Sequence, residues 1–103
     1  LVDRYLDAAR NGDVAMLRTC IEKGVDPRVK DEVGRSALAL AVRNARSLEA
    51  ARFLEERGVP VDEPDLLGRT PLSESAGLGD AAVVTWLLEK GADPNQRLKR
   101  KVW

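Results

Sequence analysis

The sequence predicts an all-α fold, a solenoid in which helix–turn–helix units stack on one another. Nearly the same eight residues occur twice, as DEVGRSAL at 31–38 and as DLLGRTPL at 65–72, so the two copies are 34 residues apart. Three corners of similar sequence place Gly24, Gly58 and Gly91 at intervals of 34 and 33 residues. Apolar residues at helical spacing precede each corner. A fixed period of this size is typical of repeat proteins.

The first helix of each unit is expected to be short. Ser36 and Thr70 are suited to the N-cap, because a hydroxyl accepts a hydrogen bond from a free amide of the first turn. Pro71 follows Thr70 and has no N–H to leave unsatisfied. Small residues come next, as ALALAV at 37–42 and LSESAG at 72–77. The first unit begins directly at its helix, where the expected exposure of Arg4 and Asp7 is typical of a capping unit.

The second helix of each unit is expected to be longer and to bury one apolar face. That face is formed by Met16, Leu17, Cys20 and Ile21, by Leu48, Ala51 and Leu54, and by Val83, Val84, Leu87 and Leu88. Lys or Arg followed by the corner glycine suits a left-handed C-terminal cap and the negative end of the helix dipole. The middle unit has one more residue between its helices. We expect this insertion to bulge the turn around Ala45, Arg46 and Ser47.

These residues together resemble the ankyrin repeat. The segment GRTPLSESAGLGDAAVVTWLLEKGADPN at 68–95 is similar to the family's period of about 33 residues and to its TPLHxA motif, with the histidine replaced by Ala39 and Ser73. The resemblance covers essentially the whole chain and implies short β-hairpin fingers between the helix pairs, with DxxG as the finger turn. It also implies one domain over residues 1–103. Its units would span about 1–30, 31–64 and 65–97, with a basic tail over 97–103.

The composition argues against an enzyme. The chain has no histidine and one cysteine, which leaves no Ser-His-Asp or Cys-His machinery and no credible metal site. Cys20 lies among apolar residues and is expected to be buried. A lone cysteine favours a reducing, cytoplasmic (intracellular) compartment. No apolar run approaches the ~20 residues of a membrane span. We therefore expect no catalytic residue, no cofactor and no small-molecule substrate.

A repeat stack offers an extended concave surface for binding. In the ankyrin family the contact positions are the finger tips and the exposed ends of the first helices. Carried onto this sequence, they are Glu32, Val33, Arg35, Leu66, Leu67 and Arg69 on the fingers, and Arg10, Asn11, Arg43, Asn44 and Leu78 on the helix ends. The arginines are expected to make a locally basic groove, since guanidinium groups bind carboxylates. Exposed leucines with a charged rim are typical of a protein interface.

The favoured hypothesis is a non-enzymatic protein–protein interaction module, whose partner carries acidic and apolar residues. A second hypothesis is an accessory or targeting domain of a larger multidomain protein, favoured by the missing start methionine and the basic tail. A third is a nucleic-acid binder that uses the arginines and the tail. A formal net charge of +0 and the lack of stacking aromatics argue against the third. Three units are near the minimum for a repeat stack, so we expect modest stability.

Overall fold

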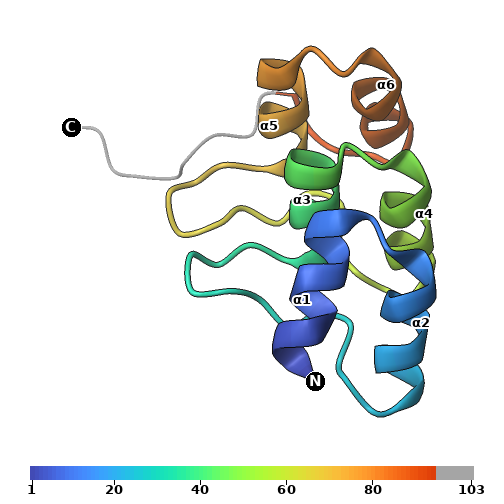
Figure 1. Cartoon of the computed structure of the whole chain (residues 1–103). Coiled ribbons are helices and arrows are strands. Elements are labelled where there is room, and N and C mark those ends of the chain that lie inside the picture. Colours follow the sequence, from blue (N-terminus) through green and yellow to red (C-terminus); the bar gives the residue numbers. More distant parts are fainter. Residues whose placement is uncertain (95–103) are drawn as a thin grey trace.

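The computed structural model describes residues 1–94 and arranges them as three stacked helix pairs (Figure 1). The elements are α1 (Val2–Asn11), α2 (Val14–Glu22), α3 (Ala37–Leu40) with the π-helical turn η1 (Ala41–Ala45), α4 (Leu48–Glu56), α5 (Pro71–Leu78) and α6 (Ala81–Glu89). We call α1, α3 with η1, and α5 the inner helices, because they face the long loops. The outer helices α2, α4 and α6 form the second row. The predicted all-α stack of helix–turn–helix units is confirmed.

Side-chain caps start the inner helices where the sequence predicted them. The Ser36 hydroxyl accepts a hydrogen bond from the Ala39 amide at 3.2 Å. Thr70 accepts from the Ser73 amide at 3.1 Å, and the Ser73 hydroxyl accepts in return from the Thr70 amide at 2.9 Å. The serine that replaces the family's histidine therefore completes a capping box. The outer helices also begin with a side-chain acceptor bonded to the amide three residues later, at Asp13, Ser47 and Asp80.

The expectation of a short inner helix fails in the first unit, whereas α5 is shorter than α6 and the α-helical part of the middle unit, α3, has 4 residues. α1 has 10 residues and α5 has 8, while α2, α4 and α6 have 9 each. The physical reason is the position of the residue that ends each inner helix. Gly12 and Gly79 are the first residues to take a left-handed conformation, at φ 71° and 73°, and the helix continues up to them.

The extra residue of the middle unit lies inside the inner helix, so the expected bulge of the following turn is wrong. In the first unit the amide of Asp13 donates to the carbonyl oxygen of Ala8 at 2.9 Å. The equivalent bond in the middle unit runs from Ser47 to Ala41, at 3.1 Å, and encloses one more residue. The backbone accommodates it as the wider turn η1. Arg46 then takes the left-handed position, at φ 51°.

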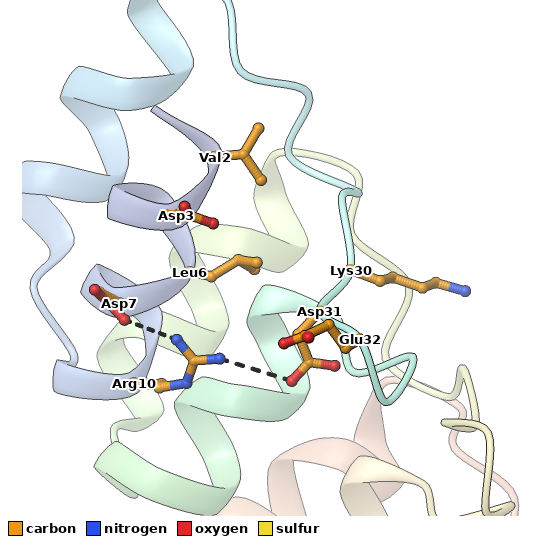
Figure 2. A pocket seen from close by; sticks show the side chains of 8 residues that line it. All are labelled: Val2, Asp3, Leu6, Asp7, Arg10, Lys30, Asp31 and Glu32. Carbon is orange, nitrogen blue, oxygen red and sulfur yellow. Dashed lines mark hydrogen bonds and ion pairs between the residues drawn. The ribbon is translucent and has the colours of Figure 1, made fainter.

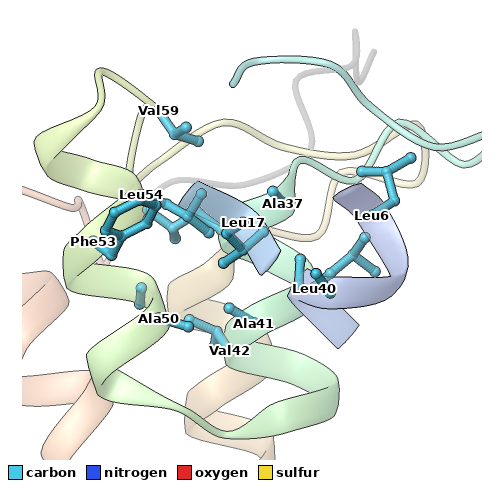
Figure 3. Packing of buried hydrophobic residues seen from close by; sticks show 14 of the residues in the cluster. Leu6, Leu17, Ala37, Leu40, Ala41, Val42, Ala50, Phe53, Leu54 and Val59 are labelled. Carbon is cyan, nitrogen blue, oxygen red and sulfur yellow. The ribbon is translucent and has the colours of Figure 1, made fainter. Parts of the chain in front are cut away.

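One apolar core runs through the three helix pairs. Figure 3 shows its central part, where side chains from four helices meet: Leu6 of α1, Leu17 of α2, Leu40 of α3 and Leu54 of α4. Cys20 is buried in the same core, as predicted, and so is Trp86. No helix within residues 1–94 is long and apolar enough to cross a membrane.

Two loops extend from the inner side of the stack as fingers, residues 25–35 and 59–69 (Figure 1). Each carries the predicted DxxG turn, in which the glycine amide donates to the aspartate carbonyl oxygen: Gly34 to Asp31 at 3.1 Å, and Gly68 to Asp65 at 3.0 Å. Within the described residues β-pairing is limited to one antiparallel bridge, between Lys30 and Ser36. The basic tail at 97–103 and the end of the predicted third unit lie outside the described residues.

Candidate partner-binding groove

The aspartate at the start of each finger turn holds the tip in one conformation. Oδ1 of Asp31 accepts hydrogen bonds from the amides of Val33 and Arg35, at 2.9 and 2.8 Å. Asp65 makes the equivalent two bonds in the second finger, both at 2.9 Å. Each finger therefore presents its side chains from a backbone that is already ordered, which lowers the entropic cost of binding.

The two fingers also bond to each other. The Leu66 amide donates to the Val33 carbonyl oxygen at 2.9 Å. Gly34 makes this approach possible, because its φ is +82° and a Cβ there would lie 3.0 Å from both the amide nitrogen and Cγ of Leu66. The side chains of Leu66 and Leu67 stay outside, 74% and 61% exposed. The second finger tip is thus an apolar surface on a fixed backbone.

Three of the four predicted arginines form a charged chain between the second and third units. The Arg35 Nε lies 3.7 Å from Oδ2 of Asp65, and the Arg69 Nε donates to that same oxygen at 2.9 Å. The Arg43 Nε donates to Oε1 of Glu74 at 3.1 Å, and the Arg69 Nε lies 3.7 Å from this oxygen. In space, these charged side chains follow one another in the order Arg35, Asp65, Arg69, Glu74 and Arg43. We call these five residues the charged ladder.

Asp65 lies between Arg35 and Arg69 in the charged ladder and is ionised at neutral pH. Its side chain is 3% exposed, and this burial acts to raise the pKa of its carboxyl group. The amides of Arg69 and Leu67 and the Arg69 guanidinium group all bond to the ionised form. These bonds outweigh the burial, so the pKa of Asp65 lies below its ordinary value. The Nε of Arg35 is buried and makes no hydrogen bond within the described residues.

The fourth arginine, Arg10, lies in an acidic hollow between α1 and the first finger (Figure 2). Arg10 is 2.7 Å from Asp7 and 3.8 Å from Asp31, so two carboxylates flank one guanidinium group. The hollow has a volume of about 450 Å³ and is lined by Val2, Asp3, Leu6, Asp7, Arg10, Lys30, Asp31 and Glu32. Lys30 pairs with Glu63 of the second finger as well. Carboxylates outnumber cations here, in contrast to the charged ladder.

The arginines from which we expected a locally basic groove do not stand alone. Every arginine of the set has a carboxylate partner, because the finger aspartates and Glu74 lie between the arginines. The sequence contained a signal for these carboxylates: DxxG occurs twice, and Glu74 takes the place of Leu40 of the middle unit.

The candidate residues differ in exposure. Glu32, Asn11, Asn44, Leu66 and Leu67 are exposed, whereas Val33, Leu78, Arg10, Arg35, Arg43 and Arg69 are partly buried.

The part of the chain that the structure describes, residues 1–94, holds no cluster of three or more acidic or cysteine side chains suited to a metal ion. Its candidate binding surface, which we call the groove, comprises the finger tips, the charged ladder and the hollow at Arg10. Stacked helix pairs with ordered fingers define a solenoid repeat protein. A family model for ankyrin repeats in three copies matches residues 6–97. The chain belongs to the ankyrin repeat family.

Curated relatives agree with this assignment. A putative ankyrin repeat-containing protein of Treponema pallidum is 32% identical over 96 residues, which cover 92% of this chain and 32% of the relative. The RelA-associated inhibitor of Mus musculus is 34% identical over 84% of this chain and 10% of its own length. The palmitoyltransferase AKR1 of Lachancea kluyveri is 37% identical over 92% of this chain and 13% of its own length. The chain thus spans about a third or less of these relatives.

The family sets the broad class of function. Ankyrin repeats are generally protein-interaction modules, and the family is typically non-enzymatic.

Proposed function

We propose that this chain acts as one ankyrin-repeat domain that binds a partner protein through its finger tips and the groove beside its inner helices. The observation that carries the proposal is the exposure of two adjacent leucines, Leu66 and Leu67, on a finger whose backbone is held by hydrogen bonds. Burying them against the chain's own core would be favourable, yet the fold holds them in water. An apolar patch in this position fits an interface with another protein.

The surroundings of the leucines support the proposal. Arg69 stands two residues further along the same finger, and the charged ladder connects it to Arg43 on the inner helix. A central apolar contact with a polar rim is the usual anatomy of a protein interface. Arginine is also enriched among the residues that contribute most to binding. The partner is therefore proposed to carry apolar residues for the finger tip and acidic residues for the arginines.

The test is affinity capture from a lysate of the source cells, with bound proteins identified by mass spectrometry. The chain is compared with the double variant Leu66→Ser/Leu67→Ser, after circular dichroism has confirmed that the variant is folded. The matched control is Leu88→Ser, which removes an exposed leucine from α6, outside the groove. We expect a protein that the chain and the control retain and the double variant loses. Equal capture by all three would contradict the proposal.

A second candidate is an accessory or targeting domain within a longer protein. The observation that favours it is the small share of each relative that this chain covers, from about a third down to a tenth. In this case the groove positions another domain or its target and contributes no chemistry. The discriminating measurement is the length of the parent reading frame in messenger RNA from the source cells. A frame that encodes no further domain would contradict this candidate.

Nucleic-acid binding is the weaker alternative, because the arginines on which it depends already have carboxylate partners. A binding constant for RNA or DNA that falls steeply with salt would revive it.

A further inference from the structure

We propose that Arg43 and Arg69 together form a binding site for one carboxylate group of the partner, an inference that rests on the proposed function of the groove. The two arginines come from different elements, the inner helix of the second unit and the finger that precedes α5. Glu74 of α5 brings them together, since both Nε atoms lie within 4 Å of its Oε1, at 3.1 and 3.7 Å. The pair is thus assembled across the boundary between two units.

The hydrogen bonds leave the outer edges of both guanidinium groups available. Arg43 donates to Glu74 through Nε, and Arg69 donates to Asp65 through Nε. The terminal Nη groups of both arginines make no hydrogen bond to any residue of the described part of the chain. The two side chains remain 37% and 33% exposed. A guanidinium group that is held at Nε and free at Nη is oriented in advance for a carboxylate.

The charge balance of the ladder favours a ligand with one negative charge. The ladder begins and ends with an arginine, so three cations alternate with two anions, Asp65 and Glu74. One carboxylate would bring the local charge to zero. A phosphate group would bring about two negative charges beside Glu74, which would then be repelled. For this reason we commit to an aspartate, a glutamate or a C-terminal carboxylate of the partner.

The neighbouring surface defines the rest of the ligand. Leu67 is 61% exposed and stands two residues before Arg69 on the same finger. A partner segment that places an apolar residue close to its acidic residue would meet both features at once. The other end of the groove makes a contrast, because Arg10 is already flanked by Asp7 and Asp31 and the surrounding hollow is acidic. The carboxylate is therefore directed to the end of the groove that Arg43 and Arg69 occupy.

The test uses a displayed library of random 12-residue peptides, selected on the whole chain. Enriched peptides are synthesised, and their dissociation constants are measured for the chain and for Arg43→Gln, Arg69→Gln and Leu66→Ser. Arg52→Gln, which removes an exposed arginine from the outer helix α4, is the matched control. Each peptide is also made with its acidic residue changed to the amide, so that double-mutant cycles report the coupling between that residue and each arginine.

We expect the peptides to share an acidic residue close to an apolar one. Loss of either arginine, or of the peptide's carboxylate, should weaken binding about tenfold, the low end of the range for a charged hydrogen bond. Removing the carboxylate and Arg43 together should cost no more than either change alone, and Arg52→Gln should have no effect. A phosphoserine in place of the acidic residue should not bind more tightly.

Other outcomes separate the two proposals. Peptides that lose affinity with Leu66→Ser but not with Arg43→Gln or Arg69→Gln would overturn the carboxylate site and leave the groove as the binding surface. Tenfold tighter binding of the phosphoserine peptide would identify phosphate as the ligand and overturn the choice of a carboxylate. Two outcomes would contradict both the carboxylate site and the proposed function. In one, every groove variant binds the peptides with the same dissociation constants as the parent chain. In the other, the selection enriches no peptide.

Discussion

The Leu66 amide donates a 2.9 Å hydrogen bond to the Val33 carbonyl oxygen, and this bond joins the backbones of the two fingers. The two residues occupy neighbouring positions in successive finger turns. The bond therefore sets how far one finger tip stands from the next, and with it the spacing of the side chains offered to a partner. Gly34 lies directly against this bond, because a Cβ on it would come within 3.0 Å of the Leu66 amide.

Gly34→Ala is expected to destabilise the fold by roughly 2–3 kcal/mol. Part of the loss comes from the positive φ of +82°, which costs an alanine about 1 kcal/mol, and the rest comes from the displaced Leu66 backbone. The control is Gly58→Ala, which also has a positive φ, +92°, but whose Cβ would meet nothing within 4 Å. Urea denaturation measures both losses. Equal losses would show that the contact with Leu66 carries no energy.

Asp65→Asn is expected to make the free energy of unfolding fall less steeply as the pH is lowered. The pKa of Asp65 is lower in the folded state than in the unfolded chain, where it is about 3.9. Its contribution to stability is therefore complete above the unfolded pKa, and it is lost as the pH falls through that value toward the folded pKa. Denaturation between neutral pH and about pH 3 measures the slope. Asp62→Asn, which removes an exposed carboxylate from the same finger, should leave the slope steep.

Tyr5→Phe is expected to destabilise the chain by about 1–2 kcal/mol, the cost of leaving a partly buried acceptor without its donor. The Tyr5 hydroxyl donates to the Pro27 carbonyl oxygen at 2.8 Å and so ties α1 to the first finger. Thermal or urea denaturation at neutral pH measures the loss. A variant as stable as the parent chain would show that the freed carbonyl oxygen of Pro27 is hydrated without cost.

Tyr5 should also resist ionisation. Burial raises its pKa, and the charge of Asp26 raises it further. A raised folded pKa means that this contribution to stability is complete below the unfolded value of about 10 and is lost as the pH rises above it. Tyr5 is the one tyrosine of the chain, so tyrosinate absorbance in an alkaline titration reports on it alone. Ionisation near pH 10 in the folded chain would contradict the prediction.

Local features of the fold were predictable from the sequence, because they depend on neighbouring residues. The caps at Ser36 and Thr70 follow from a hydroxyl placed just before a helix, and the DxxG turns follow from glycine at a positive φ. The ion pairs of the groove were not predictable. Arg69 bonds to the aspartate four residues before it, whereas Arg35, in an equivalent frame, lies against Asp65 of the next finger. Only the packing of one unit on another decides between these two positions.

The extra residue of the middle unit illustrates the same limit. The sequence shows that one residue is added between the helices, but it does not show which backbone segment absorbs it. The caps at Ser36 and Ser47 fix both ends of this segment, and the residue enters the helix between them as η1. Leu78 was expected to be exposed on similar local grounds, yet it is partly buried.

Arg46→Gly is expected to stabilise the fold by about 0.5–1 kcal/mol. Arg46 is the one non-glycine residue with a positive φ among residues 1–94, and it stands where the other two units have Gly12 and Gly79. Glycine removes the free-energy cost of holding a side chain in the left-handed region. This gain exceeds the free-energy cost of the extra conformational freedom that glycine gives the unfolded chain. The reverse change, Gly79→Ala, should cost about 1 kcal/mol, because its φ is +73° and its Cβ would meet nothing within 4 Å. Urea denaturation compares the two variants. A loss of stability in Arg46→Gly would mean that the Arg46 side chain contributes to the fold.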